Sequence, residues 1–359
     1  DTVPFVATQV SADDAEALGS GDNAQSQPTG VEQAHFEQNV HLGYEADEQV
    51  TEAVFEDPVS SLQTSPAITV ASLSEPRCEG CDRDLSHCCC HEKWMVSVDW
   101  LYLQPRGGSN LAFSFPTNIC FGPPQGKVGQ IDYDNDSGVR WSIARALSPC
   151  SWLSVSGTHF EADVSTNQTP APGAIVQPLL LVFPNPLTCD AATSAFARAR
   201  SELRFDHYDI DYGQALFQAC GISVTGLVGV RIAEMDQSLR VDYDQDSVRT
   251  GIDLRGAGPR AGVGGRKDCG SWHFNGDVAL SLISANVDAS YKQNNAISGL
   301  AVDVEQSFDR IVPVLDLETS IACDLTQHVT LAAGYQYSIW FNMVTQGDYI
   351  SSLQHGNFN

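Results

Sequence analysis

The feature that most constrains this fold is a series of long segments in which apolar and polar side chains alternate. From Gly221 to Ala233, one set of alternate positions is mainly β-branched and the other is small or polar, as expected for a β-strand with one oily face. Three glycines and many β-branched residues disfavour a helix there. The sequence therefore predicts an all-β protein with a closed sheet. Similar alternation returns at residues 94–103, 139–143, 272–282, 311–321 and 329–342.

Strand length separates a membrane barrel from a soluble sandwich. The last three of these segments are longer than the ~5–6 residues common in globular sheets and approach the ~9–11 residues that cross a bilayer. Aromatic residues at both ends of the oily face of residues 94–103 suit the interfacial girdle of a membrane barrel. The sequence has no apolar run approaching the ~20 residues of a spanning helix. We therefore expect a strand-built protein in contact with membrane lipid.

Length and charge divide the chain into two parts. Its 359 residues suffice for two average domains or one large barrel. The formal net charge of −26 excludes the basic footprint of a nucleic-acid-binding protein. Residues 1–93 hold 18 acidic and 3 basic residues, which leaves 27 acidic and 16 basic residues beyond them. We predict an acidic, cysteine-bearing N-terminal arm over residues 1–93 and a β-barrel domain over residues 94–359.

The arm has few aromatic residues and no sustained period, a composition typical of segments that are disordered alone. An ordered arm must then lie against its own barrel or a neighbouring subunit, and its length favours the neighbour. Short apolar patches at residues 3–6, 53–55 and 67–70 are candidate anchors or added strands. The chain begins at Asp1 without methionine, which predicts a processed product whose signal peptide has been removed.

Eleven cysteines predict an oxidising compartment, and their odd number prevents complete pairing within one chain. The favoured interpretation is disulfide bonding within or between chains. Zinc is an alternative because His91 follows the last clustered cysteine, although the gap from Cys81 to Cys88 is short for a ribbon or finger. Free thiols are a third interpretation. The candidate disulfide or assembly residues are Cys78, Cys81, Cys88, Cys89 and Cys90.

Charged residues on the polar faces of the predicted strands are candidate lumen-lining residues. Polar, charged interiors are normal for outer-membrane barrels, and a net acidic lumen would favour cations through its local field. The alternative is that the charges pair across a narrow interior and nothing passes. These candidates are Arg140, Arg231, Asp277, Asp316 and Glu318.

Two stretches have the alternating oxygen ligands of a calcium loop. Asp132, Asp134 and Asp136 form the first, and residues 242–246 nearly repeat it. Calcium needs ~6–8 oxygens, but no suitably spaced glutamate follows, so solvated strand ends are the favoured interpretation over a bound cofactor. The sequence lacks nucleophile-elbow, zinc-protease, phosphate-loop and dinucleotide-binding motifs. We expect no catalytic residues and no enzyme activity.

Several short motifs occur in an order that resembles one bacterial family. They lie at residues 98–106, 138–143, 208–213, 227–233, 256–262, 312–318 and 333–340. From Trp94 to Tyr349 the chain resembles the Legionella-type major outer-membrane porin family, a group greatly expanded in planctomycetes. The resemblance implies an exported, antiparallel outer-membrane β-barrel at the bacterial cell surface. Some relatives form pores, and disulfide cross-linking is a theme among them. Counting the alternating segments, we expect about 10–12 strands.

Two features depart from the family pattern. The chain stops at Gly356–Asn359 without a further strand ending in an aromatic residue, so either something else closes the barrel or the sequence is truncated. The acidic arm is also not a porin feature. Our leading hypothesis is a barrel that assembles with itself, through arm and cysteines, into a cell-surface oligomer or array, structural and with pore formation left open. The alternatives are a porin for passive diffusion of small solutes and a soluble, secreted β-rich structural protein.

Overall fold

The computed structural model describes residues 60–72, 94–106, 111–117, 127–172, 174–182, 194–219, 221–326 and 328–356, with the backbone alone at 60–72 and 116–117. By its contacts the chain divides into Asp1–Val54 and Phe55–Asn359, and every described residue belongs to the second unit. The elements are β1 (Ser60–Ser72), β2 (Trp94–Arg106), β3 (Leu111–Thr117), β4 (Gly129–Ile131), β5 (Asp136–Ser148), β6 (Ser151–Gln168), β7 (Ile175–Pro178), β8 (Ala197–Ala219), β9 (Ile222–Tyr243), β10 (Asp246–Cys269), β11 (Trp272–Asn295), β12 (Gly299–Asp324), β13 (Thr330–Trp340) and α1 (Gln346–His355).

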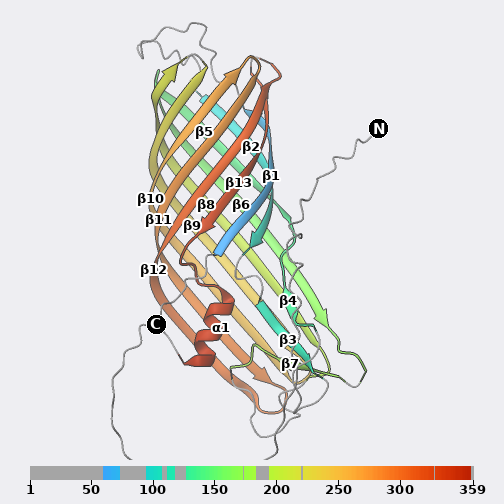
Figure 1. Cartoon of the computed structure of the whole chain (residues 1–359). Helices are drawn as coiled ribbons and strands as arrows, with labels where there is room; N and C mark the ends of the chain where they lie inside the picture. Colours follow the sequence, from blue (N-terminus) through green and yellow to red (C-terminus); the bar gives the residue numbers. More distant parts are fainter. Residues whose placement is uncertain are drawn as a thin grey trace, which may run out of the picture. The chain divides into compact units, whose positions relative to one another are not determined.

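Ten of the described strands form one closed antiparallel barrel (Figure 1). Around the wall their order is β1-β13-β12-β11-β10-β9-β8-β6-β5-β2, and β1 pairs with both β13 and β2. The other three strands form a small separate sheet in the order β4-β3-β7. The predicted antiparallel barrel of about 10–12 strands is confirmed. A soluble sandwich of two packed sheets is wrong, because a single sheet closes on itself.

The wall has two heights. β1, β2 and β5 each have 13 residues and β13 has 11, close to the ~9–11 residues of a bilayer crossing. β8 to β12 have 22 to 26 residues. These five strands therefore continue past the short ones as an open trough, which we call the extension. The opposite end, where β10 turns into β11 at Gly270 and β8 into β9 at Gly221, we call the turn end; both glycines have positive φ.

The alternation of apolar side chains changes face partway along the long strands. On β11, the alternate apolar residues from Trp272 to Leu282 are exposed on the outside of the wall. From Ile283 to Tyr291, the alternate apolar residues are buried on the inside. Pairing with β10 and β12 continues through this point without a shift in register. The reversal therefore reflects a change in surroundings. The apolar environment lies outside the first half of the strand and inside the second half, where it is the protein core.

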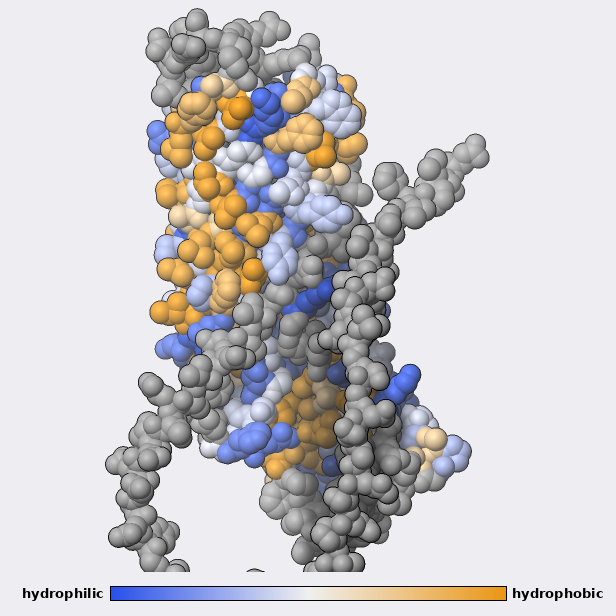
Figure 2. All heavy atoms as spheres, in the orientation of Figure 1, coloured by the Kyte–Doolittle hydropathy of each residue, from blue (hydrophilic) through white to orange (hydrophobic). Residues whose placement is uncertain are grey.

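The outward apolar side chains form a belt around the turn-end half of the barrel, in the upper half of Figure 2. On three strands the belt covers eleven residues each, Ile222–Ile232, Trp272–Leu282 and Ile311–Ile321, which matches the bilayer-crossing length. Large and small residues interlock within it, since a Cβ at Gly213 would overlap the Trp152 ring. A soluble monomer rarely exposes so large an apolar surface, so the belt is the lipid-facing surface.

The inner face of the extension carries the main hydrophobic core. The small sheet and α1 pack into the trough: Phe113 on β3 and Val176 on β7 are fully buried, and Ile350 on α1 is nearly so. Thr345 caps α1 by accepting a hydrogen bond from the Asp348 backbone N–H, while the Asp348 carboxylate accepts one from the Thr345 backbone. The wall residues in this core include Ala199, Phe205, Met235, Val241, Ile252, Leu254, Ile283, Val287 and Tyr291.

The barrel is closed by a strand that the sequence places in the arm. β1 supplies the wall between β13 and β2, and in its register Ala67 lies opposite Gly334. The wall therefore begins before the predicted boundary at Trp94, and the patch at residues 67–70 is an added strand of its own barrel. Because α1 rather than another strand follows β13, β1 fills the remaining place in the wall. The other two patches, at residues 3–6 and 53–55, lie outside the described residues.

Candidate functional site in the barrel lumen

The inner face of the belt half is polar because, along each strand there, inward polar residues alternate with outward lipid-facing residues. On β8, Asp209 and Asp211 point inward between Tyr208, Ile210 and Tyr212, which are exposed in the belt. The same alternation on other strands turns further acidic and basic side chains into the lumen. Charged groups from opposite sides of the wall therefore meet inside a narrow barrel.

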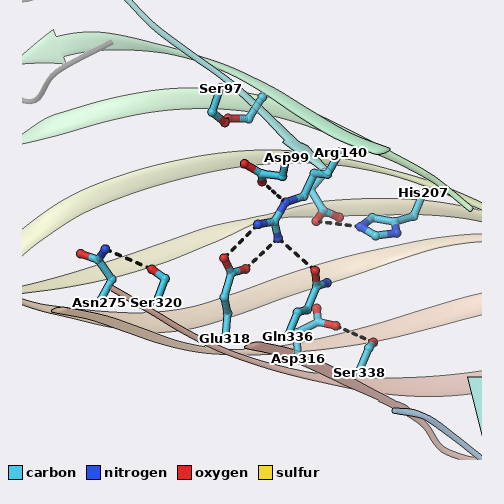
Figure 3. Close-up of polar contacts among 12 residues, drawn as sticks. Ser97, Asp99, Arg140, His207, Asn275, Asp316, Glu318, Ser320, Gln336 and Ser338 are labelled. Atoms are coloured by element: carbon cyan, nitrogen blue, oxygen red, sulfur yellow. Dashed lines mark hydrogen bonds and ion pairs between the residues drawn. The ribbon is translucent and has the colours of Figure 1, made fainter. Parts of the chain in front are cut away.

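Arg140 on β5 is the centre of the first group of contacts (Figure 3). Its Nε donates to Asp99 on the adjacent strand β2 at 2.6 Å, and its terminal nitrogens donate to both carboxylate oxygens of Glu318 at 2.7 and 2.9 Å. It also donates to Gln336 at 3.3 Å. Glu318 lies on β12, four places away from β5 around the wall. The guanidinium therefore bridges the lumen.

Arg231 on β9 is the centre of the second group. It donates two hydrogen bonds of 2.7 Å to the Asp209 carboxylate on β8, and it lies 2.7 Å from Asp316 on β12. Arg260 on β10 donates to the same Asp316 oxygen at 2.6 Å. The Arg231 side chain is only 3% exposed. Two cations thus share one carboxylate, and the contacts again cross between strands that are not neighbours.

Together these groups form what we call the lumen cluster, with five carboxylates and three guanidinium groups. A buried ion pair gives little net stability, but removing one partner leaves a buried charge and costs about 3–5 kcal/mol. The cluster can therefore hold opposite parts of the wall in fixed positions and occupy the space between them. Its members are Asp99, Arg140, Asp209, Asp211, Arg231, Arg260, Asp316 and Glu318.

In the extension, the small sheet, α1 and the residues after β7 occupy the trough into which the lumen leads. Buried tyrosines attach them to the wall: Tyr291 donates to the Leu180 carbonyl at 2.8 Å, and Tyr349 on α1 donates to the Ala289 carbonyl at 3.3 Å. Gln354 on α1 donates to two backbone carbonyls of residues 179–181. The helix and residues 179–181 are therefore fixed to each other and to the long strands.

Burial keeps the tyrosine hydroxyls of the extension protonated. It raises the pKa of Tyr133 to about 12, although a hydrogen bond with Ser201 opposes the shift. Burial also raises the pKa values of Tyr243 and Tyr291 above the usual range. These hydroxyls act as neutral hydrogen-bonding groups and offer no acid–base chemistry near neutral pH.

The structure brings four of the five predicted lumen residues into the lumen cluster: Arg140, Arg231, Asp316 and Glu318. The fifth, Asp277, lies on the inner side of β11 opposite Glu318 and Gly264, and it is exposed to solvent.

The predicted calcium site is not assembled in the described residues, and the predicted cysteine site lies outside them. Within the described residues, no three His, Cys, Asp or Glu side chains converge as metal ligands. Asp132 and Asp134 are exposed, and Asp136 accepts a hydrogen bond from the next backbone N–H; the extended chain spreads these carboxylates rather than gathering them. The residues of the predicted disulfide or zinc site that lie outside the described part of the chain are Cys78, Cys81, Cys88, Cys89, Cys90 and His91.

Half of the lumen cluster was missing from the sequence prediction. Asp209 and Asp211 could have been found, because they alternate with Tyr208 and Tyr212 in a segment already interpreted as a strand. Arg260 lies in a glycine-rich strand whose few side chains give no clear oily face. Which charges pair across the lumen depends on barrel closure, and local periodicity does not contain that information.

Residues 86–358 match the model of a family described as the Legionella pneumophila major outer membrane protein precursor. Curated proteins give no significant match. The outer membrane protease OmpT from Escherichia coli aligns at 8% identity and a TM-score of 0.28, covering 79% of this chain and 94% of that chain. A Pseudomonas aeruginosa FadL homologue aligns at 8% identity and a TM-score of 0.23, covering 80% and 89%. Likenesses this weak say nothing about activity.

In the described part of the chain, no helix is long and apolar enough to cross a membrane. The family match covers residues 86–358, well over half of the sequence. The protein therefore belongs to the Legionella major outer membrane protein family and is a β-barrel of the bacterial outer membrane.

Proposed function

We propose that the protein is a non-conducting, non-catalytic outer-membrane barrel that acts as an anchor and building block. In this proposal the barrel holds the acidic N-terminal residues and the clustered cysteines at the membrane, and copies of the chain join through them. The observation that carries the proposal is the bridge from Arg140 to Glu318 across the lumen.

Barrel size supports a closed interior. Barrels of about eight strands are filled by side chains, whereas those with 16–18 strands leave an aqueous channel. Ten strands lie near the filled end of this range. The lumen cluster occupies the belt half, and α1 with the small sheet occupies the extension. A solute would have to pass two blocked regions, the first occupied by ion pairs and the second by an apolar core.

The placement of cysteines supports association at the turn end. Cys269 and Cys323 have free thiols and flank Trp272, since both are register partners of that residue. β1 ends and β2 begins at the same end, because Ser72 lies opposite Thr330 and Ser97. The five clustered cysteines fall in the sequence between these two strands. Thiols of the turns and of this connection can therefore meet those of another copy.

The experiment combines two independent readouts on the purified full chain. In planar bilayers we expect no steady single-channel steps, and on non-reducing gels we expect multimers that collapse on reduction. Steady steps from reduced protein would identify a diffusion porin and reject the non-conducting barrel. Monomers alone on gels of protein extracted under thiol blocking would reject assembly through cysteines.

A matched pair of variants sharpens the conductance readout. Arg140→Ala removes the bridge to Glu318 and enlarges the lumen, whereas Arg255→Ala removes an exposed arginine on the outer wall. If the lumen cluster blocks the barrel, Arg140→Ala gives more leak events than Arg255→Ala. Equal and frequent events in both variants and the parent protein would contradict a block by the cluster.

A further inference from the structure

The outer wall of the extension carries its charges in cross-strand rows. One row is basic: Arg240 on β9 lies opposite Arg249 on β10, which lies opposite Lys292 on β11. A second row, four residues nearer the belt, is acidic, and it consists of Asp236, Asp253 and Asp288 on the same three strands. Like charges directly opposite each other destabilise a sheet. The wall thus carries two unfavourable rows where mixed rows would be stabilising.

Between the two rows lies a line of small residues, Ser238, Gly251 and Ser290, which are again register partners. They form the floor of a groove with a volume of about 340 Å³. Its lining also includes Asp303 and Glu305 on β12. The groove therefore has a cationic rim, two carboxylates from β12 and two serine hydroxyls on its floor. It runs across the strands on the outside of the wall, and the acidic row lies beside it on the belt side.

The cationic rim is only partly neutralised by the protein. Arg240 pairs with Asp242 at 3.0 Å and Lys292 with Asp303 at 2.9 Å. Arg249, between them, is exposed and makes no ion pair with a carboxylate of the described residues. The strongest unmet interaction of the groove is therefore with an anion at Arg249, flanked by two further cations.

The height of the groove above the belt selects among membrane anions. Ser238 follows the last belt residue of β9, Ile232, by six residues, and Ser290 follows Leu282 of β11 by eight. At ~3.3 Å per residue and a tilt of ~45°, this places the floor roughly 14–19 Å beyond the hydrocarbon edge. A simple phospholipid head group extends only about 5–8 Å. The groove lies beyond such head groups but within reach of a lipid that carries several sugars.

We propose that this groove binds the phosphorylated oligosaccharide of a membrane glycolipid. A phosphate group contacts Arg249 with Arg240 and Lys292 beside it, while sugar hydroxyls donate to the groove's two carboxylates from β12 and exchange hydrogen bonds with Ser238 and Ser290. Charged residues with fixed spacing suit a ligand that combines anionic groups and hydroxyls. The long connections between β2 and β5 and between β6 and β8 are at the extension end, the feature that marks the extracellular side of such barrels. The inference does not depend on whether the barrel conducts.

The test measures binding of the detergent-solubilised full chain to a rough lipopolysaccharide with phosphorylated core sugars, to its dephosphorylated form, and to phosphatidylglycerol vesicles. We expect the double variant Arg249→Gln with Lys292→Gln to bind the phosphorylated glycolipid at least tenfold more weakly. Arg255→Gln is the matched control, since Arg255 is exposed on the same wall, pairs with Glu234 and lies outside the groove. We expect this control to change binding less than twofold.

Three results would overturn the proposal. Equal binding of phosphorylated and dephosphorylated glycolipid would exclude phosphate recognition. An equal loss in the double variant and in Arg255→Gln would indicate general charge attraction rather than the groove. Binding to phosphatidylglycerol with the same dependence on Arg249 would assign the rim to simple phospholipid head groups.

Discussion

At the scale of single residues, the same charge types behave differently inside and outside the barrel. In the lumen, Arg231 is almost completely buried and has carboxylates on two sides. On the outer wall, Arg255 is 71% exposed and pairs with Glu234 at 2.9 Å. Exposed pairs are worth ~0–1 kcal/mol, whereas loss of one partner of a buried pair costs several times more. Sequence alternation could assign both arginines to strands, but it could not predict which of them contributes more to stability.

Replacement of Arg231 by alanine should therefore destabilise the barrel by about 3 kcal/mol, because Asp209 and Asp316 lose a shared partner. Urea unfolding in lipid vesicles, followed by tryptophan fluorescence, measures the change. Arg255→Ala is the control and should cost no more than about 1 kcal/mol. A similar small cost for both would show that the lumen cluster contributes no more than surface pairs.

The acidic row beside the groove predicts that the stability of the fold depends on pH. The pKa of Asp236 is raised, first by partial burial and then by the hydrogen bond and charge of Asp253. A carboxyl whose folded pKa is raised favours the fold below the unfolded pKa, and this stability is lost as pH rises through the folded value. Asp236→Asn should therefore raise the melting temperature at pH 7 and give little change near pH 3. Asp132→Asn, in an exposed loop, should have no such effect, and a gain for Asp236→Asn that is equal at both pH values would contradict the pairing.

At the scale of elements, the long strands show what periodicity can and cannot predict. The alternation between Trp272 and Leu282 predicts a strand and its oily face, and both are correct. Beyond Ile283 the alternation continues with its phase reversed, which marks the edge of the bilayer. The sequence contains this signal, but its meaning depends on the packing of α1 and the small sheet into the trough. Those contacts join residues far apart in the chain, so no local pattern predicts them.

Helix α1 was not predicted from the sequence, although its first turn carries a recognisable capping signal. Thr345 and Asp348 have the spacing of a capping box, and Gly356 ends the helix in a left-handed conformation. Thr345→Ala should destabilise the helix by about 1 kcal/mol, and faster amide hydrogen exchange over residues 346–355 than in the parent protein would report it. Ser351→Ala, on the exposed side, should leave exchange unchanged or slow it, because alanine favours helix. Equal acceleration in both variants would mean that the cap does not fix the helix.

At the scale of the whole molecule, closure combines the two ends of the described wall. The late strands run from β8 to β13 as successive hairpins, and the remaining gap beside β2 is filled by β1 from the other end of the sequence. The apolar patch at residues 67–70 signalled a strand, but its partner could not be read from composition. The arm was instead predicted to favour a neighbouring subunit. In the structure β1 pairs within its own chain, because the edges of β13 and β2 both offer it hydrogen-bonding partners.

This closure predicts a specific cross-link. Thr69 and Ala332 are register partners, and antiparallel partners have Cα atoms ~4.5–5.5 Å apart, within the range of a disulfide. Thr69→Cys with Ala332→Cys should form an intramolecular disulfide on oxidation, identified by mass spectrometry of the linked peptides. Thr69→Cys with Ala279→Cys is the control and should not link, because Ala279 lies on β11, two strands beyond β13. A cross-link found only between two copies of the chain would show that β1 closes a neighbour's barrel instead of its own.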